Sequence, residues 1–416
     1  MNRKQLTLLI VVAAVLGGLG WVAYQKQSAP YREATQKMGG KVLPNFPLND
    51  VEQIAIKQPK GELNLAKKDD IWVVKNRGDY PANFDTISET IRKFWELKVA
   101  KPVKTGPSRL AALELVPPDK GAGTLVEFKD KSGKTINSVL LGAKSMKHGS
   151  DDSSFGGGGG WPDGRYVMVG SDVQTVALVT EPFSNVEAKP EDWLKKEWFK
   201  VEKLKAISVT TTNATNNWKL ARESETGEWK LAEAKKDEVL DNGKSGTATS
   251  ALSYPSFNDV TTNAAPSATG MDKPITATLE TFDGFTYTAK VGGKSGDENY
   301  FFQIAVAGNF PKERTPGKDE KPEDKEKLDK EFAENRKKLE EKLKTDKAFE
   351  KWTYLVSKWT VDPLLKERKD LLMEKKEEPK KEEPKKEEPK KEEPKKEEPK
   401  KDDKPATPPA PKSDSK

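Results

Sequence analysis

The sequence contains no cysteine and only one histidine, His148. The lack of cysteine excludes disulfides, cysteine nucleophiles, thiolate zinc sites and the lipid-modified cysteine of a lipoprotein. A single histidine also excludes any mechanism that needs two histidines or a Cys–His pair. Composition alone therefore leaves few ways to build an active site.

The sequence also lacks a large excess of either positive or negative charge. The 416 residues include 73 Lys and Arg and 67 Asp and Glu, which gives a net charge of +6. Nucleic-acid-binding domains concentrate basic residues on one face, whereas both signs are mixed along this chain, so we expect no nucleic-acid partner. Hydrophobic residues make up 34% and charged residues another 34%. This polar composition predicts that part of the chain is disordered or thinly packed.

Only one long run lacks charge, LTLLIVVAAVLGGLGWVAY at residues 6–24. A helix needs about 20 apolar residues to cross the bilayer core, and Trp21 and Tyr24 suit the membrane interface. Arg3 and Lys4 precede the run, so the positive-inside rule places the N-terminus in the cytoplasm. A cleaved signal peptide is the alternative, but its apolar core spans about 7–15 residues and no convincing small-x-small cleavage site is present. The run predicts a single-pass membrane anchor with the bulk of the chain outside the cytoplasm; in a Gram-negative bacterium this is the inner membrane, with the bulk of the chain periplasmic.

Strand patterns begin after residues 25–47, a linker that contains proline and glycine. VEQIAIK at 51–57 alternates apolar and polar residues, and GELNLAKKDDIWVVK at 61–75 indicates two strands joined by a turn. Two further strand pairs are predicted, a hairpin at 124–145 and a pair at 165–180 that is broken by a glycine and a serine.

NFDTISETIRKFWELKVA at residues 83–100 has helical periodicity instead. Asn83 or Asp85 is expected to cap this helix. Its predicted buried face consists of Ile87, Ile91, Phe94 and Trp95. Residues 108–118 predict a short helical turn that proline ends.

The same order of elements recurs about 150–160 residues later, as a tandem duplication predicts. The matching stretches are LKAISVT (204–210), WKLARESETGEWKLA (218–232), TATSALSYPSFNDV (247–260), ITATLETFDGFTYTAKVGGKS (275–295) and ENYFFQIAVAG (298–308). The second of them places Trp229 where the first copy has Trp72. The third stands where the first copy has its helix and places Leu252 near the slot of Ile91.

VGGKS at 291–295 and Gly243-Lys244-Ser245 both look like the end of a phosphate-binding loop. Such a loop also needs a glycine five residues before its last glycine, where these stretches have Thr288 and Glu238. The loop must in addition open a helix, whereas 291–295 ends a predicted hairpin. We therefore expect a polar turn after the strand and no bound nucleotide.

An insertion at residues 311–350 interrupts the second copy, and within it 318–350 is rich in Glu and Lys at i,i+4 spacing. This spacing predicts an exposed helix. A thin apolar stripe on it consists of Leu328, Phe332, Leu339 and Leu343. We expect the stripe to dock on its own repeat rather than on a partner, because a thin stripe is typical of the inner face of a surface helix.

The strand that the second copy still lacks is expected at 351–361, after the insertion. Residues 362–375 predict a closing helix with Asp362 as its cap and Pro363 at its first position. From residue 374 the chain consists largely of KKEEP repeats. A proline at every fifth residue blocks a continuous helix, and the repeat has no apolar residue for a core, so this tail is predicted to be disordered.

Candidate chemistry is confined to the loop KHGSDDSSFGGGGGWPDGRY, residues 147–166. His148 with Asp151 and Asp152 could ligate a metal, and Asp152 with Asp163 could act as an acid/base pair on a sugar. Five successive glycines would hold such groups in place only at a large cost in entropy. We therefore expect a loop without ligand, no catalytic residue, no metal site and no cofactor.

EDWLKKEWF at residues 191–199 joins the two copies. We expect its apolar side chains to pack at the junction between the repeats, as part of the core. An exposed aromatic patch would instead favour glycan or protein binding. The side chains concerned are Trp193, Leu194, Trp198 and Phe199.

Together these stretches resemble the bacterial family catalogued as domain of unknown function 4340. The resemblance rests on the N-terminal anchor and on VEQIAIK, DDIWVVK, NFDTISETI, LELVPP, LLGAKS and RYVMVG, and it covers about residues 42–310 and 351–373. The family has no established activity and no assigned catalytic residues. Some members are associated with ABC-transporter auxiliary components of the gliding-motility type, so the resemblance implies a partner-binding role in the envelope.

These patterns predict an α+β protein with two tandem repeats, each a mostly antiparallel sheet with one or two helices. The predicted segments are 1–5 (cytoplasmic), 6–24 (transmembrane helix), 25–47 (linker), 48–190 (first repeat), 191–373 (second repeat, with the charged helical insertion at 311–350) and 374–416 (disordered tail). The predicted function is that of a non-enzymatic envelope scaffold or transporter-accessory protein that binds other proteins. The alternative is a protein that binds or cleaves envelope glycans through residues 147–166.

Overall fold

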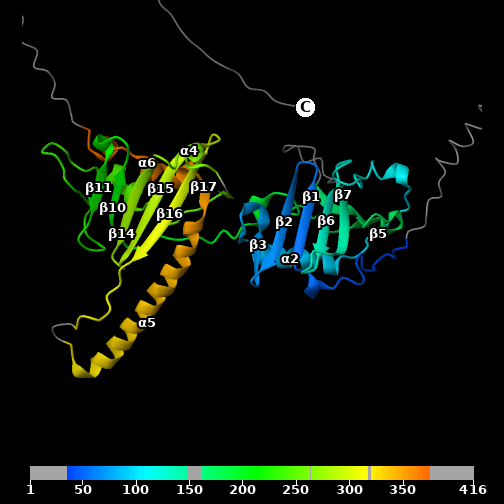
Figure 1. Cartoon of the computed structure of the whole chain (residues 1–416), viewed down its shortest axis with the longest axis horizontal. Coiled ribbons are helices and arrows are strands. Elements are labelled where there is room, and N and C mark those ends of the chain that lie inside the picture. Colours follow the sequence, from blue (N-terminus) through cyan, green and yellow to red (C-terminus); the bar gives the residue numbers. More distant parts are fainter. Residues whose placement is uncertain (1–34, 148–160, 263, 317–319, 375–416) are drawn as a thin grey trace, which may run out of the picture. The chain divides into compact units, whose positions relative to one another are not determined.

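A computed structural model of the chain describes residues 35–147, 161–262, 264–316 and 320–374. They form two antiparallel sheets with few helices, which confirms the predicted α+β class (Figure 1). The predicted membrane span at 6–24 and the KKEEP tail lie outside the described residues. Among the helices that are described, none is long and apolar enough to span a bilayer.

The first sheet has the strand order β4-β3-β2-β1-β6-β7-β8-β9-β5. Its strands are β1 Gln53–Gln58, β2 Gly61–Lys68, β3 Ile71–Val74, β4 Tyr80–Pro81, β5 Lys101–Pro102, β6 Thr124–Lys129, β7 Thr135–Lys147, β8 Trp161–Val169 and β9 Ala177–Val179. The predicted hairpins are therefore present. Asp69 and Asp70 connect β2 to β3 with φ angles of 48° and 62°, which aspartate tolerates better than most residues in a two-residue turn.

Helix α2, Phe84–Glu96, belongs to the first repeat and begins where the sequence predicts. The Asn83 side chain accepts hydrogen bonds from the backbone N–H groups of Asp85 and Thr86, so Asn83 is the cap. Ile87, Ile91 and Phe94 are buried as predicted. The expectation for Trp95 is wrong: its side chain is 39% exposed, because it lies one residue beyond Phe94 and so at the rim of the apolar stripe. The helix also ends at Glu96, before the predicted residue 100.

The second sheet has the order β12-β11-β10-β14-β15-β16-β17-β13. Its strands are β10 Leu204–Thr210, β11 Trp218–Ala221, β12 Lys230–Leu231, β13 Asp259–Thr261, β14 Ile275–Thr281, β15 Phe285–Ser295, β16 Asn299–Gly308 and β17 Thr353–Ser357. Starting from β12, this order reproduces that of the first sheet from β3 to β5, strand for strand. The two sheets are thus two copies of one arrangement.

Four helices accompany the second sheet: α3 Asn242–Thr249, α4 Pro266–Thr269, α5 Pro322–Lys347 and α6 Lys358–Leu365. The helix expected at 247–260 is α3, which begins five residues earlier, and the end of that range forms β13. The predicted closing helix with Asp362 as its cap is wrong, because α6 begins at Lys358 and contains Pro363. Proline donates no backbone hydrogen bond, and α6 ends two residues after it.

Short 3₁₀ turns connect many of these elements. They are η1 Leu48–Asp50, η2 Lys75–Arg77, η3 Pro107–Arg109, η4 Val173–Thr175, η5 Pro190–Trp193, η6 Ala214–Asn216, η7 Ala348–Lys351 and η8 Arg368–Leu371. The helical turn expected at 108–118 is no more than η3.

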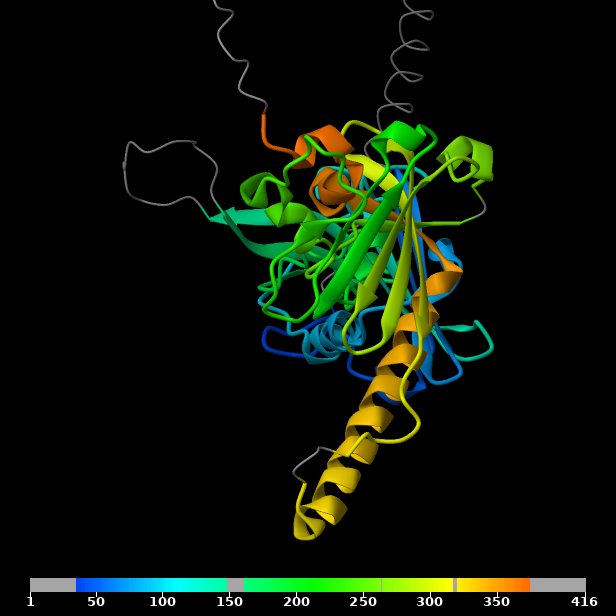
Figure 2. The same cartoon turned by 90° about the vertical axis from the view of Figure 1, so that its left-hand side faces the viewer.

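Helix α5 is inserted between β16 and β17, where the first repeat has only η4 between β8 and β9. Near its C-terminal end, Leu339 and Leu343 pack against the core, and Asp346 accepts a hydrogen bond of 2.7 Å from the Tyr287 hydroxyl. The N-terminal half extends past the end of the sheet (Figures 1 and 2). All four side chains of the predicted stripe are half-buried. Leu339 and Leu343 pack against the core of their own repeat, whereas Leu328 and Phe332 lie nearer the N-terminus of the helix, away from that core.

VGGKS is part of strand β15, so the turn expected there is wrong. The register shifts at this point, and the same shift occurs between β7 and β8 of the first repeat. A Cβ atom on Gly292 would lie 2.3 Å from the carbonyl oxygen of Thr269, and one on Gly142 would lie 2.2 Å from that of Leu113. Each glycine allows another segment of its repeat to cross close to the sheet, so the motif is structural in both copies.

Candidate functional site at the junction of the repeats

The linker between the repeats continues the edge of the first sheet. Leu194 forms an antiparallel bridge with Ala82, next to β4. The Trp193 carbonyl accepts a hydrogen bond from the Asn83 N–H at 2.8 Å, and the Lys195 N–H donates to the Pro81 carbonyl at 2.9 Å. The edge of β4 is therefore covered by the chain that leads into the second repeat.

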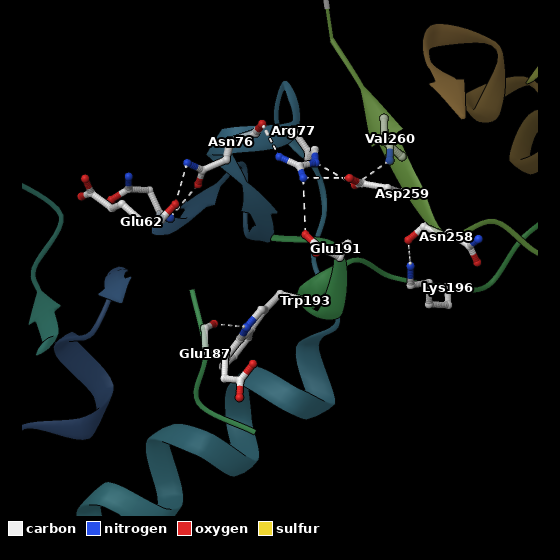
Figure 3. A network of polar contacts seen from close by, with 11 residues as sticks. Glu62, Asn76, Arg77, Glu187, Glu191, Trp193, Lys196, Asn258, Asp259 and Val260 are labelled. Atoms are coloured by element: carbon white, nitrogen blue, oxygen red, sulfur yellow. Dashed lines mark hydrogen bonds and ion pairs between the residues drawn. The ribbon is translucent and has the colours of Figure 1, made fainter. Parts of the chain in front are cut away.

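Arg77 projects from η2 toward the second repeat (Figure 3). The preceding residue, Asn76, holds this turn on β2: its side chain accepts from the Asn64 N–H at 2.7 Å and donates to the Glu62 carbonyl at 3.1 Å. Gly78 follows with a φ of 64°, a conformation that glycine adopts without strain. The direction of the guanidinium is thus set by its neighbours in the chain.

The guanidinium of Arg77 forms a bidentate ion pair with Asp259, the first residue of β13. Both Nε–Oδ1 and Nη2–Oδ2 distances are 2.7 Å, and Nη2 lies 3.4 Å from a carboxylate oxygen of Glu191 (Figure 3). The two paired side chains are only 22% and 19% exposed. The hydrogen bonds to Asp259 raise the pKa of Arg77, so the guanidinium group stays positively charged.

Lys196 of the linker contacts the residues just before β13. Its ammonium group donates to the Asn258 carbonyl at 2.6 Å and lies 4.7 Å from the centre of the Phe257 ring. Burial lowers the pKa of Lys196. Because the ammonium group is held by backbone carbonyls and an aromatic ring, its role is to fix the segment before β13.

Beneath these polar contacts, Tyr80 of β4 enters an aromatic cluster of the second repeat. Its ring lies 4.8 Å from that of Trp352, 5.7 Å from that of Phe257 and 6.2 Å from that of Tyr354, in edge-to-face geometry. Tyr80 is 2% exposed. Such pairs favour association beyond the area they bury, so the repeats share one core here.

The prediction for residues 191–199 is confirmed. Trp193, Leu194 and Phe199 are almost completely buried, and Trp198 packs against the same core. The indole N–H of Trp193 donates to the Glu187 carbonyl at 3.2 Å (Figure 3). Sequence reasoning missed Arg77 and Asp259, which lie 182 residues apart and occur in no recognisable motif.

The side chains at this junction bind the two repeats to each other. The Arg77 and Asp259 charges neutralise each other, and the Lys196 ammonium group is hydrogen-bonded to the backbone. Among residues 35–147, 161–262, 264–316 and 320–374, no group of three His, Asp or Glu side chains is placed to hold a metal. The polar network therefore holds two folded units together.

The loop with candidate chemistry is described only in part. His148, Asp151 and Asp152 lie outside the described residues. Asp163 is on β8 with an exposed side chain, and Trp161, at the start of the same strand, is 60% exposed. The hairpin of β7 and β8 thus presents an exposed tryptophan and an exposed aspartate close together in sequence.

The second phosphate-loop candidate lies at the start of α3. The Asp241 side chain accepts hydrogen bonds from the N–H groups of Gly243 and Lys244, at 2.9 and 3.1 Å. These are the groups that a phosphate would need at a helix N-terminus. The carboxylate occupies them as an ordinary helix cap.

The comparisons with known proteins include a match to a protein family. Residues 72–274 match the family model described as Domain of unknown function (DUF4340). The match begins in β3 and ends just before β14, so it includes the linker and both sides of the junction. No curated protein and no solved structure matches the chain. The resemblance to this family that the sequence indicates is confirmed by the match over residues 72–274.

Proposed function

We propose that this protein is a non-enzymatic scaffold or accessory subunit, anchored in the bacterial inner membrane by residues 6–24, that binds other envelope proteins. The observation that carries the proposal is the N-terminal half of α5. It is a folded helix that extends past its own sheet, at a position where the first repeat has only η4 (Figure 1).

An extension of this kind contributes little to the core of its own repeat. The 26 residues of α5 span about 39 Å, and the core contacts are made near the C-terminal end. Leu328 and Phe332 are spaced four residues apart, so they lie on one face of the extended part. Amphipathic helices with this spacing bind in apolar grooves of other proteins.

The segment that precedes α5 stabilises the N-terminal half of this helix. Arg314 forms ion pairs with Glu320 and with Asp329, which tie the incoming segment to the helix. The junction supports the same function, because a scaffold has to keep its contact surfaces in a fixed relation. Membrane transport subunits are the partners that the family resemblance favours.

The test is a mild-detergent pull-down of the full chain from membranes, with copurifying proteins identified by mass spectrometry. A stripe variant, Leu328→Ser with Phe332→Ser, is compared with a control, Lys327→Ser with Glu331→Ser. The control removes an exposed i,i+4 ion pair of the same helix. Both variants introduce the same number of serines into the helix.

Stoichiometric recovery of membrane transport subunits with the wild-type chain and the control, and their loss with the stripe variant, is the expected result. Equal recovery with both variants would place the contact elsewhere on the protein. Recovery of the chain alone, together with bound cell-wall fragments, would contradict the scaffold role and favour glycan recognition. Trp161→Ala with Asp163→Ala would then test the exposed end of the β7–β8 hairpin.

A further inference from the structure

The segment that enters the first repeat runs antiparallel to the chain that follows α2. Lys41 and Lys98 form an antiparallel bridge. The Gly39 N–H donates to the Val99 carbonyl at 2.8 Å, and the Val99 N–H donates to the Gly40 carbonyl at 2.9 Å. These contacts fix the first described residues of the chain on the outer border of the repeat.

This border is basic. Residues 35–41 and 92–104 contain seven lysines and arginines but only one acidic residue, Glu96. The rest of the chain mixes both signs almost evenly, so the local excess stands out. Lys37, Lys41, Lys98 and Lys101 are all exposed.

Two large apolar side chains lie among these lysines. Met38 is 78% exposed, and Trp95 is 39% exposed with the Lys41 ammonium group 3.8 Å from the centre of its ring. We call Lys37, Met38, Lys41, Trp95, Lys98 and Lys101 the basic rim. Lysine and tryptophan are the residues that proteins place at the level of lipid headgroups, with the apolar part inward and the charge in water.

We propose that the basic rim rests on the anionic headgroups of the membrane in which the protein is anchored, with Met38 and Trp95 at the interface. The inference rests on the proposed anchor at residues 6–24. Only residues 25–34 separate that run from the first described residue, and ten residues reach at most about 35 Å. The rim is therefore held within a short distance of the bilayer.

Charge complementarity and tether length favour the lipid surface over a soluble anion. Each lysine close to an anionic membrane strengthens binding about fivefold, and an exposed methionine and tryptophan add apolar contact that a soluble anion would not use. Docking would hold the first repeat against the membrane.

The test uses the full chain reconstituted in lipid nanodiscs with and without phosphatidylglycerol. Because the sequence has no cysteine, Met38→Cys provides a single site for a polarity-sensitive fluorophore, and a lipid-attached quencher reports its depth. Lys131→Cys, at the exposed turn between β6 and β7, is the position control. A charge variant, Lys37→Glu with Lys41→Glu and Lys98→Glu, is compared with Lys205→Glu, Lys219→Glu and Lys290→Glu in the second repeat.

The proposal predicts strong quenching at position 38 in discs with phosphatidylglycerol, weak quenching without it, and little at position 131. The rim charge variant should lose the quenching, and the control charge variant should keep it. Equal quenching at both positions, or quenching that survives the rim variant, would overturn the proposal. If the chain associates with the discs but the fluorophore at position 38 is not quenched, only the proposed contact of the basic rim with the membrane is overturned. If the chain does not associate with the discs at all, the proposed anchor is overturned as well.

Discussion

At the scale of single residues, the charges of this protein hold its parts together. Arg77 reaches across the junction to Asp259, and Arg368 of η8 binds Glu238 within the second repeat. Both guanidinium groups are bidentate and partly buried, the geometry in which an ion pair contributes more than a pair on an open surface.

Replacing Arg77 with alanine is expected to lower the free energy of unfolding by about 2 kcal/mol, because Asp259 loses its partner while remaining largely buried. The measurement is urea unfolding in a double-mutant cycle with Asp259→Ala. The double variant should cost less than the sum of the single ones, by about 1 kcal/mol. Additive costs would show that the pair is not coupled, and Arg92→Ala on the exposed side of α2 is the control.

The pH dependence of stability should report on Glu238. Its side chain accepts from Arg368 and from the Lys235 N–H, which lower its pKa to about 2. Because the folded pKa lies below the unfolded value of about 4.3, the stabilisation is complete above that pH and is lost as pH falls toward 2. Glu238→Gln should therefore lower Tm at pH 6 but have progressively less effect at lower pH. A Tm difference that stays constant on acidification, or that is matched by Glu228→Gln, would refute this role.

At the scale of elements, the sheet of each repeat needs a glycine where another segment of the same repeat crosses close to it. Gly142 and Gly292 occupy matching positions, and each lies against a carbonyl of its own repeat. The next position differs between the copies: the second has Gly293 and the first has Ala143. A Cβ atom on Gly293 would lie 3.6 Å from the Thr269 carbonyl oxygen, an ordinary contact.

Because of this geometry, alanine substitutions at two neighbouring glycines are expected to lower the free energy of unfolding by different amounts. Gly292→Ala should lower the free energy of unfolding by about 2–4 kcal/mol, because the new methyl group forces a carbonyl or a strand to move. Gly293→Ala should cost less than about 1 kcal/mol, as Ala143 in the first copy suggests. Chemical unfolding of the two variants measures both. A loss for Gly293→Ala as large as that for Gly292→Ala would contradict this steric explanation.

The elements themselves could largely be predicted from the sequence, because period-two and helical patterns are local. The hairpins around Asp69 and Gly284, the start of α2 at Asn83 and the position of the insertion all follow from such patterns. The end of α2, the start of α6 and the pairing of Arg77 with Asp259 could not be predicted in this way. They depend on which surfaces meet after folding, and the sequence pattern contains no signal for contacts across 182 residues.

At the scale of the whole molecule, the two repeats have a common core. Tyr80 comes from the first sheet, but its aromatic neighbours belong to the second repeat. Repeat proteins in general gain much of their stability from the interface between neighbouring units. At equilibrium the repeats should therefore unfold in a single transition, whatever the order in which they form during folding.

Tyr80→Ala is expected to lower the free energy of unfolding by about 3–5 kcal/mol and to broaden or split the transition. Hydrogen exchange should show reduced protection in β3 of the first repeat and in β13 and β17 of the second. Tyr254→Ala is the matched control, since that tyrosine is 87% exposed. Loss of protection confined to the first repeat would show that the cores are independent.

The two sheets differ in the length of the connection that leads to strand β9 in the first and to strand β17 in the second. β9 follows β8 after residues 170–176, whereas β17 follows β16 only after residues 309–352, and closing the longer connection costs roughly 1.5 kcal/mol more in entropy. β17 pairs with β13, which contains Asp259. The position of Asp259 relative to Arg77 is therefore fixed only after β17, which ends at Ser357, has formed. We therefore expect the first repeat to fold while the second is still incomplete, and the junction to close as the last step of folding.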